Sequence, residues 1–519
     1  MKNILLLFIS SFSFILIGKT QISVDLYLKN LSIIDGTGTS AFKADIGIKN
    51  DKIIFIGQTE GRPIQAKKTI NFEGYTAAPG FIDPHTHTLR DLSDSNRNKN
   101  LSYLFQGVTT VLTGNDGGSV VHIGKRLERW QKQGLGTNAG LLVGHRTLRK
   151  LIVGMDNRPP TEEEMMNMKN MLRKGLQEGA IGFSSGLYYA PASFATTKEV
   201  IELCKVAAEF DAIYDVHIRD ESTYNIGLLA AIEETIEIAQ KANIKANVSH
   251  IKALGVDVWG QSKAIIQRIE TARKAGIHIT ADQYPYQASG THLDRALLPK
   301  WVFADVDSYQ EKLKDANLLP SIKEGLQENL RKRGGASSIL LTAPVEEAFR
   351  GMTLAEVADS LKLSAIDAAL HVLHSGSSAI ASFNMKESDI QNFMRQPWIM
   401  TCSDGSNAHP RKYGTYPKKI REYVLEKQVL SLEEMIRKSS SLPAQIFGIP
   451  QRGTLKEGYF ADLIIFKVEE IKDNATFEQP DLLAEGMHYV IVNGKIVIEE
   501  GEFTGKLAGI VVKRAQKIE

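Results

Sequence analysis

The sequence predicts an α/β protein: a (β/α)8 TIM barrel with a small β-sandwich domain built from both ends of the chain. Two observations predict this fold. Short apolar runs alternate with amphipathic helical stretches through the middle of the chain, whereas both ends show the period-2 alternation of half-buried strands. The 519 residues suffice for one large core of roughly 200 to 250 residues and one or two smaller modules.

The composition is that of an ordinary globular protein, with 43% hydrophobic and 24% charged residues. Lys and Arg (62) nearly balance Asp and Glu (60), and no long basic run is present, so we expect no nucleic-acid partner. A core of this size needs no disulfide, although one between Cys204 and Cys402 is possible. The sequence carries no signal for a particular oligomeric state.

The first element is a candidate signal peptide over residues 1–20. Lys2 precedes an apolar stretch over residues 4–17, in which three serines are the only non-apolar residues. Because a membrane-spanning helix needs about 17–25 residues, this stretch matches the hydrophobic region of a signal peptide. We therefore expect an exported protein, periplasmic or secreted, with no stable membrane span once the segment is removed. An uncleaved anchor is the alternative.

The next element is the β-sandwich domain, which we assign to residues 22–77 and 450–519. Short alternating runs such as DLYLKNLSII and ADIGIKNDKIIFIG are broken by turn residues, as is typical of antiparallel strands. Near the other end of the chain, YVIVNGKIVIEEGEF contains Asn493-Gly494, a strong hairpin signal.

The barrel is assigned to residues 78–449. Apolar runs that alternate with helical stretches are typical of parallel strands buried on both faces. The eight predicted strands are 77–85, 109–114, 139–144, 180–185, 212–218, 245–250, 278–284 and 397–404. The interval 285–396 is too long for one helix and two loops, so it contains an insertion. We expect the insertion to be mainly helical and to lie over the active site.

Polar side chains gather where the predicted strands end. In a barrel enzyme the chemistry is built at these carboxyl-terminal strand ends. The strand-end residues are His85, His87, Asp116, His145, Ser185, His217, His250, Tyr284 and Asp404. A single histidine of this kind is often only a packed core residue, and Asp404 on its own fits a Ser-Asp-Gly turn. The set as a whole is not explained in this way.

The histidines and carboxylates of this set indicate a metal site. His85 and His87 share one face of a strand, because alternate side chains point the same way. Imidazole and carboxylate ligands without a thiolate indicate a hydrolytic site that binds Zn²⁺, Mn²⁺ or Fe²⁺, and not a structural zinc site.

The sequence around these residues resembles the amidohydrolase superfamily, and within it the N-acyl-D-amino-acid deacylase (D-aminoacylase) branch. The likeness runs from about residue 25 to about residue 501. The segments that carry it, in chain order, are PGFIDPHTH, GVTTVLTGNDG, LVGHRTLR, GAIGFSSGLYYAP, HIRDES, SHIKALG, QYPYQASGT and HPRKYGTYP.

The resemblance implies one tightly held zinc, bound by His217, His250 and the residue that ends the second strand. It also implies that His85, His87 and Asp404 hold or face a second, weaker divalent site. The family often has cysteine where this chain has Asp116, and a carboxylate is the harder ligand. The metal identity and the choice between one and two metals therefore stay open. The fourth strand offers serines and no lysine, so a carbamylated lysine is not available there.

Catalytic roles follow from charge. A bound dication lowers the pKa of water from about 16 to about 7 and polarises an amide carbonyl. Asp404 can take the proton of the water and pass it to the departing amine. The developing oxyanion needs a hydrogen-bond donor, and the candidates are His145, Tyr189, Tyr284 and Tyr286.

Substrate binding requires a cation for the carboxylate of the amino acid. Arg411 and Lys252 match family positions linked to that role, with Ser289 as a possible helper. Arg149 and Arg219 compete for the assignment, although structural ion pairs explain them equally well. Tyr284 and Tyr286 are further candidates for the substrate pocket.

The predicted function is metal-dependent hydrolysis of the amide bond of an N-acyl-D-amino acid, giving a carboxylate and a free D-amino acid. A dipeptidase acting on small D-residue peptides, or a cyclic amidase acting on hydantoin-like rings, is the alternative on the same metal site. A non-catalytic scaffold is a third hypothesis, but it would be expected to lack metal ligands, and every position of the ligand set is filled here.

Overall fold

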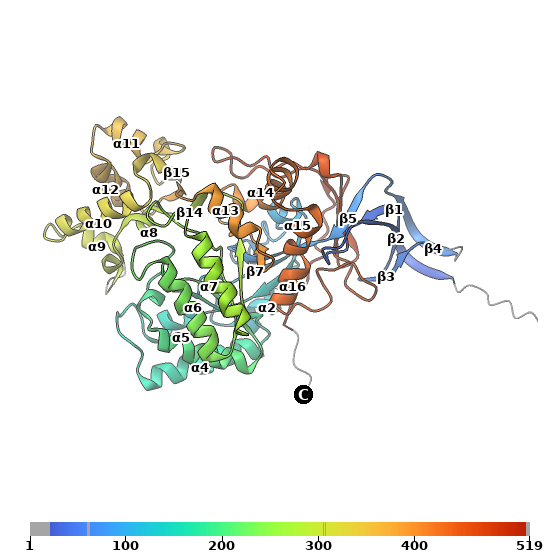
Figure 1. Cartoon of the computed structure of the whole chain (residues 1–519), viewed down its shortest axis with the longest axis horizontal. Coiled ribbons are helices and arrows are strands. Elements are labelled where there is room, and N and C mark those ends of the chain that lie inside the picture. Colours follow the sequence, from blue (N-terminus) through green and yellow to red (C-terminus); the bar gives the residue numbers. More distant parts are fainter. Residues whose placement is uncertain (1–20, 60–62, 305, 307, 515–519) are drawn as a thin grey trace, which may run out of the picture.

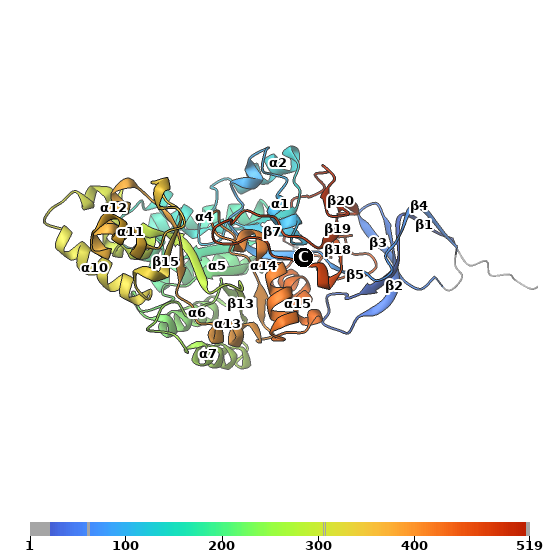
Figure 2. The same ribbon diagram turned by 90° about the horizontal axis from the view of Figure 1, so that it is seen from above.

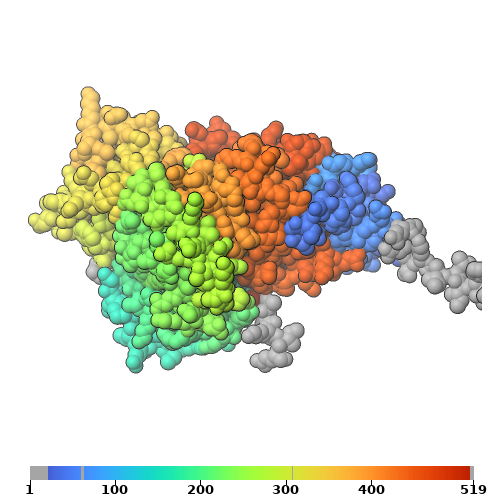
Figure 3. Space-filling view, viewed as in Figure 1, coloured from blue at the N-terminus to red at the C-terminus, as the bar shows by residue number. Residues whose placement is uncertain are grey.

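The structure is a computed structural model that describes residues 21–59, 63–304, 306 and 308–514. The predicted signal peptide, residues 1–20, lies outside the described residues. The molecule is elongated: a β domain (blue) lies at one end, the barrel in the middle and an insertion (yellow) at the other end (Figure 1). The space-filling view shows these parts joined into one continuous body (Figure 3).

The β domain joins both ends of the chain in one nine-stranded sheet, as predicted. β18 pairs antiparallel with β5 and so links the two contributions. The Asn493-Gly494 turn has φ angles of 47° and 74°, the left-handed pair that a tight hairpin requires. The strands are β1 (Ile22–Ile33), β2 (Phe42–Lys49), β3 (Lys52–Gly57), β4 (Ile64–Asn71), β5 (Thr76–Pro79), β18 (Leu463–Phe466), β19 (Met487–Val492), β20 (Lys495–Glu499) and β21 (Glu502–Phe503).

The barrel strands are parallel and coincide with the eight predicted runs. They are β6 (Phe81–Thr86), β7 (Val108–Thr113), β8 (Asn138–Leu141) with its continuation β9 (Val143–Gly144), β10 (Gly182–Gly186), β11 (Ile213–His217), β12 (Lys245–Val248), β13 (Ile279–Gln283) and β17 (Ile399–Thr401). A parallel bridge between Thr86 and Gly405 brings the end of the last strand beside the first and closes the ring.

Helices surround the barrel because their apolar faces cover its outer surface. Thr161 caps the start of α4 and forms a capping box with Glu164, which fixes where that helix begins. The helices around the barrel are α1 (Leu101–Leu104), α2 (Ile123–Gln133), α3 (His145–Ile152), α4 (Glu162–Gln177), α5 (Thr197–Glu209), α6 (Leu228–Ala242), α7 (Ser262–Lys274), α13 (Glu387–Met394), α14 (Arg411–Lys418), α15 (Leu432–Ser439) and α16 (Ser441–Ile446).

The insertion has a hydrophobic core of its own, formed by residues such as Leu293, Leu326, Leu341 and Val357. Its helices are α8 (Leu293–Leu297), α9 (Tyr309–Leu313), α10 (Leu319–Lys332), α11 (Leu354–Leu361) and α12 (Ala365–Ser375). It also holds a three-stranded antiparallel sheet that the sequence did not predict, made of β14 (Ala288–His292), β15 (Ile339–Ala343) and β16 (Ala379–Phe383). Figure 2 shows this module projecting away from the β domain.

The segment 509–511 returns to the barrel. Leu135 pairs with Gly509 and Ala139 with Val511, so this segment lies beside β8 and not within the β domain to which residues 450–519 were assigned. Both cysteines are free and buried, which shows that the possible disulfide is not formed. Among the described residues, no helix combines the length and the apolar character that a membrane crossing requires.

Candidate metal centre and substrate cavity

The six predicted metal ligands come together at the carboxyl ends of the barrel strands. Asp116, just after β7, lies at the centre of the group. Its carboxylate oxygens lie 3.5 Å from His85 Nε2, 3.6 Å from His87 Nε2, 3.8 Å from His217 Nδ1 and 3.5 Å from His250 Nε2. Five residues from four strand ends thus converge on one point.

Asp404, after β17, completes the group. Its Oδ1 lies 3.0 Å from His87 Nε2 and 3.7 Å from His85 Nε2, and its Oδ2 lies 2.7 Å from Arg411 Nη1. Asp404 therefore faces imidazoles with one oxygen and a guanidinium with the other. We refer to His85, His87, Asp116, His217, His250 and Asp404 as the donor cluster.

Several atoms of the donor cluster lack a hydrogen-bond partner although they are buried. Both ring nitrogens of His85 and Oδ1 of Asp116 are in this state. Leaving such groups unpaired costs roughly 1–3 kcal/mol each, so they are rare without a ligand. Three or more donor atoms lie within 4.8 Å of one another in the sets His85–Asp116–His250 and His85–His87–Asp404. The residues present therefore fit a divalent cation.

Three members of the donor cluster, His85, His217 and Asp404, have the charge state that suits metal binding. His250 must first lose a proton, because the carboxylates of Asp404, Asp116 and Glu221 outweigh burial and raise its pKa to about 10. Burial lowers the pKa of His217 to about 4 and that of His85 well below its usual value, so both imidazoles are neutral at pH 7. Burial opposes ionisation of Asp404, but the Arg411 guanidinium outweighs it and holds the pKa of Asp404 well below its usual range. Neutral imidazole and ionised carboxylate are the forms that bind metal.

Three residues of the donor cluster have left-handed backbones. The φ angles of Asp116, His250 and Asp404 are 54°, 37° and 47°. Such conformations cost about 1–3 kcal/mol in non-glycine residues and persist where the surroundings over-determine them. The chain turns sharply just beyond these strand ends, and the turns aim the side chains inward.

Glu221 belongs to the same site, although it is not among the residues predicted for it. Its Oε1 lies 3.2 Å from His250 Nδ1 and 2.6 Å from Lys252 Nζ, and its Oε2 lies 3.8 Å from His217 Nε2. Glu221 thus faces the two histidines that the resemblance assigns to the tightly held metal. The His-x-x-x-Glu spacing from His217 was the available signal.

The donor cluster opens into a cavity of about 740 Å³, which is within the usual range for small-molecule sites. The predicted residues Tyr189, Lys252, Tyr284, Ser289 and Arg411 all line it. Further residues of the 285–396 interval also line this cavity, among them His292, Arg295, Arg333, Thr342 and Ser377.

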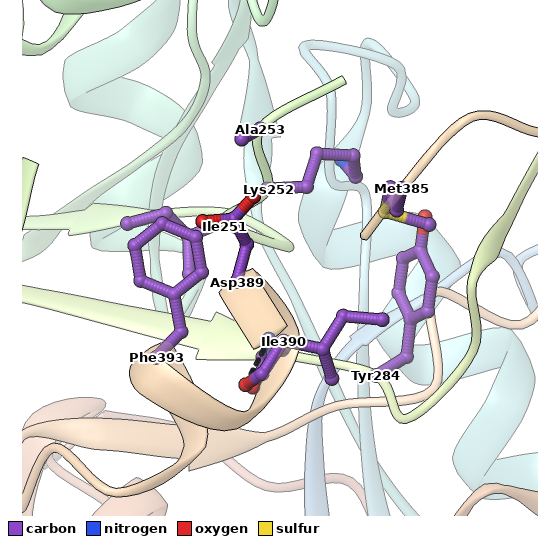
Figure 4. Close-up of a pocket in the computed structure, with 9 residues that line it drawn as sticks. Ile251, Lys252, Ala253, Tyr284, Met385, Asp389, Ile390 and Phe393 are labelled. Atoms are coloured by element: carbon purple, nitrogen blue, oxygen red, sulfur yellow. Dashed lines mark hydrogen bonds between the residues drawn. The ribbon is translucent and has the colours of Figure 1, made fainter. Parts of the chain in front are cut away.

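Two buried groups in this cavity have unused hydrogen-bonding capacity. Arg411 Nε and the Tyr284 hydroxyl have no partner within the described structure. The Arg411 guanidinium lies 4.8 Å from the centre of the Tyr284 ring. Both are positioned to receive a polar ligand group. Figure 4 shows a second pocket, which shares Lys252 and Tyr284 with this cavity and is also lined by Ile390 and Phe393 of α13.

Two predicted catalytic or substrate residues lie apart from the cavity. His145 is completely buried, and its Nε2 lies 2.9 Å from Glu199 Oε1 on α5. Tyr286 packs edge-to-face against His409, with ring centroids 5.5 Å apart. Neither lines the cavity wall. Of the four candidates for the oxyanion donor, the geometry therefore leaves Tyr189, whose ring centre lies 4.8 Å from that of His217, and Tyr284.

Arg149 and Arg219, the competing candidates for the substrate carboxylate, are occupied elsewhere. Arg149 Nη1 lies 2.6 Å from Glu199 Oε2, and Arg219 Nη2 lies 2.8 Å from Glu234 Oε1. These two cations hold helices α5 and α6 against the barrel, and Arg411 is left as the buried arginine beside the donor cluster.

The fold and the donor cluster define the class of protein. A barrel with histidines and aspartates at its strand ends and a flanking β domain is the architecture of the amidohydrolases, and the model of the Amidohydrolase family matches residues 326–498. Within that family, the chain belongs to the D-aminoacylase branch. It is 33% identical to a D-aminoacylase of Alcaligenes xylosoxydans xylosoxydans over 94% of this chain and 98% of the relative.

Solved structures agree with this placement. A crystal structure of a D-aminoacylase superposes with a TM-score of 0.81 at 30% identity, covering 95% of this chain and all of the other. The N-acyl-D-glutamate deacylase of Bordetella bronchiseptica, solved with zinc and a phosphonate inhibitor that mimics the tetrahedral intermediate, gives 0.80 at 28% identity over the same shares.

Proposed function

We propose that this protein is a metal-dependent hydrolase that cleaves the amide bond of N-acyl-D-amino acids, giving a carboxylate and a free D-amino acid. The observation that carries the proposal is the convergence of the donor cluster beside Arg411 in one cavity. Membership of the D-aminoacylase branch supports both the bond that is cleaved and the D configuration.

The metal is proposed to be zinc. Asp116, His217 and His250 would hold one ion tightly, and His85, His87 and Asp404 would hold or face a second, weaker position. The zinc in the N-acyl-D-glutamate deacylase structure supports this choice. A bound dication polarises an amide carbonyl and provides hydroxide at neutral pH by lowering the pKa of water.

Asp404 is the proposed acid–base residue. Its carboxylate is ionised because Arg411 lies 2.7 Å from Oδ2, so it can accept a proton from the attacking water. The same carboxylic acid can then give that proton to the departing nitrogen as the C–N bond breaks. The Tyr189 hydroxyl would donate a hydrogen bond to the oxyanion that forms meanwhile.

The α-carboxylate of the substrate is proposed to bind beside Arg411, on the Asp404 and Tyr284 side of the cavity. Arg411 Nε is buried and unpaired, and Lys252, Ser289 and the unpaired Tyr284 hydroxyl line the same wall. A guanidinium offers a planar pair of donors that matches a carboxylate.

A panel of N-acetyl-D- and N-acetyl-L-amino acids, assayed with and without a chelator, tests the proposed function. We expect hydrolysis of D substrates, loss of the activity with the chelator and its return when Zn²⁺ is added. An enzyme that is fully loaded with metal and hydrolyses no N-acyl-D-amino acid in the panel would contradict the proposal.

Export is also proposed, on the N-terminal sequence alone. Cell fractionation followed by N-terminal sequencing of the mature protein tests it. We expect a protein outside the cytoplasm that begins between residues 18 and 23. A chain that keeps residues 1–20 and remains in the cytoplasmic fraction would overturn the proposal.

A further inference from the structure

Arg146 is a cation in the cavity wall whose role neither the metal site nor the α-carboxylate explains. It is the second residue of α3 and follows His145 directly. Whereas His145 turns toward α5, Arg146 turns into the cavity beside Asp116, Gly118 and Tyr189. Its guanidinium carbon lies 5.9 Å from the centre of the Tyr189 ring.

The other well-buried cations of this cavity have partners. Lys252 pairs with Glu221, Arg411 with Asp404, and Arg333 donates from Nε to the carbonyl oxygen of Ala296. Within the described part of the chain, the Arg146 guanidinium forms no ion pair and no hydrogen bond with the protein. The Arg146 nitrogens are not among the buried polar atoms that lack a partner, so they remain accessible to a ligand in the cavity.

The local backbone leaves room for this side chain. A Cβ atom at Gly118 would lie 2.7 Å from Arg146 Nη2, and one at Gly117, where φ is +69°, would lie 2.9 Å from the backbone nitrogen of Arg146. Larger residues at these two positions would collide with the arginine. The turn after β7 therefore presents Asp116 to the donor cluster and leaves a space that Arg146 fills.

The charge balance of the cavity points to an anion. Its wall contains seven arginine and lysine residues and only four aspartate and glutamate residues. Arg97 and Arg295 also pair with Asp94 and Asp294, which lie outside the wall. The cations of the wall that have no carboxylate partner within the described part of the chain are then Arg90, Arg146 and Arg333, and a second carboxylate on the substrate would give one of them a partner.

We propose that Arg146 binds a second carboxylate of the substrate, so that the preferred substrates are dianionic N-acyl-D-amino acids. This inference rests on the proposed function. The contacts place Arg146 on the Asp116 and Tyr189 side of the donor cluster and Arg411 on the Asp404 and Tyr284 side. Two anion sites thus flank the position of the scissile amide. The second carboxylate belongs either to the amino-acid side chain or to a dicarboxylic acyl group.

Two pairs of near-isosteric substrates separate these sources. N-acetyl-D-glutamate is compared with N-acetyl-D-glutamine, and N-succinyl-D-alanine with its terminal amide. For the metal-loaded enzyme we expect kcat/KM to favour the acid by about 10- to 100-fold in one pair, the size of a charge-assisted hydrogen bond. The pair that shows the preference identifies the source of the carboxylate.

Variants of Arg146 complete the test. In Arg146→Met we expect the acid-to-amide ratio of kcat/KM to fall to near one, and in Arg146→Lys to take an intermediate value. The control Arg129→Gln removes an exposed cation on α2, outside the cavity wall, and we expect it to leave the ratio unchanged.

Either of two results would overturn the proposal: a wild-type enzyme without preference for the acid in both pairs, or a preference that survives in Arg146→Met. Hydrolysis of the monoanionic amide substrates by the wild type keeps this failure separate from a failure of the proposed function, in which no N-acyl-D-amino acid would be cleaved. Circular dichroism and metal content verify that each variant is folded and loaded.

Discussion

At the scale of single residues, a substitution at Asp404 can distinguish a role in metal binding from a role in proton transfer. It lies at the edge of the donor cluster, whereas Asp116 lies at the centre, between His85 and His250. We expect Asp404→Asn to keep the tightly held metal and to lose turnover by about 10²- to 10⁴-fold, since an amide cannot accept the proton. Metal analysis and steady-state kinetics on one preparation check both halves of this prediction.

The matched control for Asp404→Asn is Asp211→Asn, which makes the same chemical change at an exposed residue paired with Lys245. We expect the control to keep full turnover. Unchanged turnover in Asp404→Asn itself would remove the acid–base assignment.

Glu221 acts through its neighbours. Its carboxylate lies 3.2 Å from His250 Nδ1, where it can orient the ring and keep Nε2 directed toward the donor cluster. We expect Glu221→Gln to weaken metal affinity by about 10- to 100-fold, measured by competition with a chromophoric chelator. Glu237→Gln, a surface change beside Lys241 on α6, is the control. Equal affinities in the two variants would show that Glu221 does not position His250.

At the scale of elements, α5 is tied to the barrel by a buried polar group. Glu199 accepts from both His145 Nε2 and Arg149 Nη1, and the side chains of all three are almost completely buried. Removing one partner of such a group leaves uncompensated charge, so we expect Glu199→Gln to lower the free energy of unfolding by about 3–5 kcal/mol. Denaturant unfolding measures the change. Glu202→Gln, which is partly exposed on the same helix, is the control, and we expect it to cost less than 1 kcal/mol.

The contribution of Glu199 to the stability of the protein is expected to decrease at low pH. His145 and Arg149 together outweigh burial and lower the pKa of Glu199 below its usual value. The stabilisation is therefore complete above the unfolded pKa of about 4.3 and is lost as the pH falls through the lower folded value. We expect the stability difference between wild type and Glu199→Gln to shrink below about pH 4. A difference that is constant from pH 7 to pH 3 would contradict the assignment.

The sequence predicted the regular strands of the barrel and missed the sheet of the insertion and the start of α3. All eight barrel strands were found because parallel strands buried on both faces form apolar runs. The sheet β14–β16–β15 was missed because its strands are far apart in the chain, within an interval that was expected to be mainly helical. His145 was placed at a strand end correctly, but α3 starts at that residue and turns it toward α5, which strand periodicity does not reveal.

At the scale of the whole molecule, one ion would connect strand ends that are up to 319 residues apart, from His85 to Asp404. A metal that binds only the folded barrel stabilises it by about 2.7 kcal/mol when its free concentration is 100 times its dissociation constant. We therefore expect a chelator to lower the thermal midpoint and Zn²⁺ to restore it. In His217→Ala, which lacks one metal ligand, we expect the chelator to lower the thermal midpoint much less. Identical midpoints with and without the chelator in the wild type would argue against the site.

The donor cluster contains no sulfur ligand, which bears on the redox conditions in which the protein can work. All six donors are nitrogen or oxygen atoms, and the two thiols of the chain, Cys204 and Cys402, are fully buried with pKa values that burial raises further. Peroxides and alkylating reagents attack exposed thiolates, and neither sulfur is one. Catalysis by this protein is therefore expected to persist under oxidative stress that inactivates enzymes whose metal is held by sulfur.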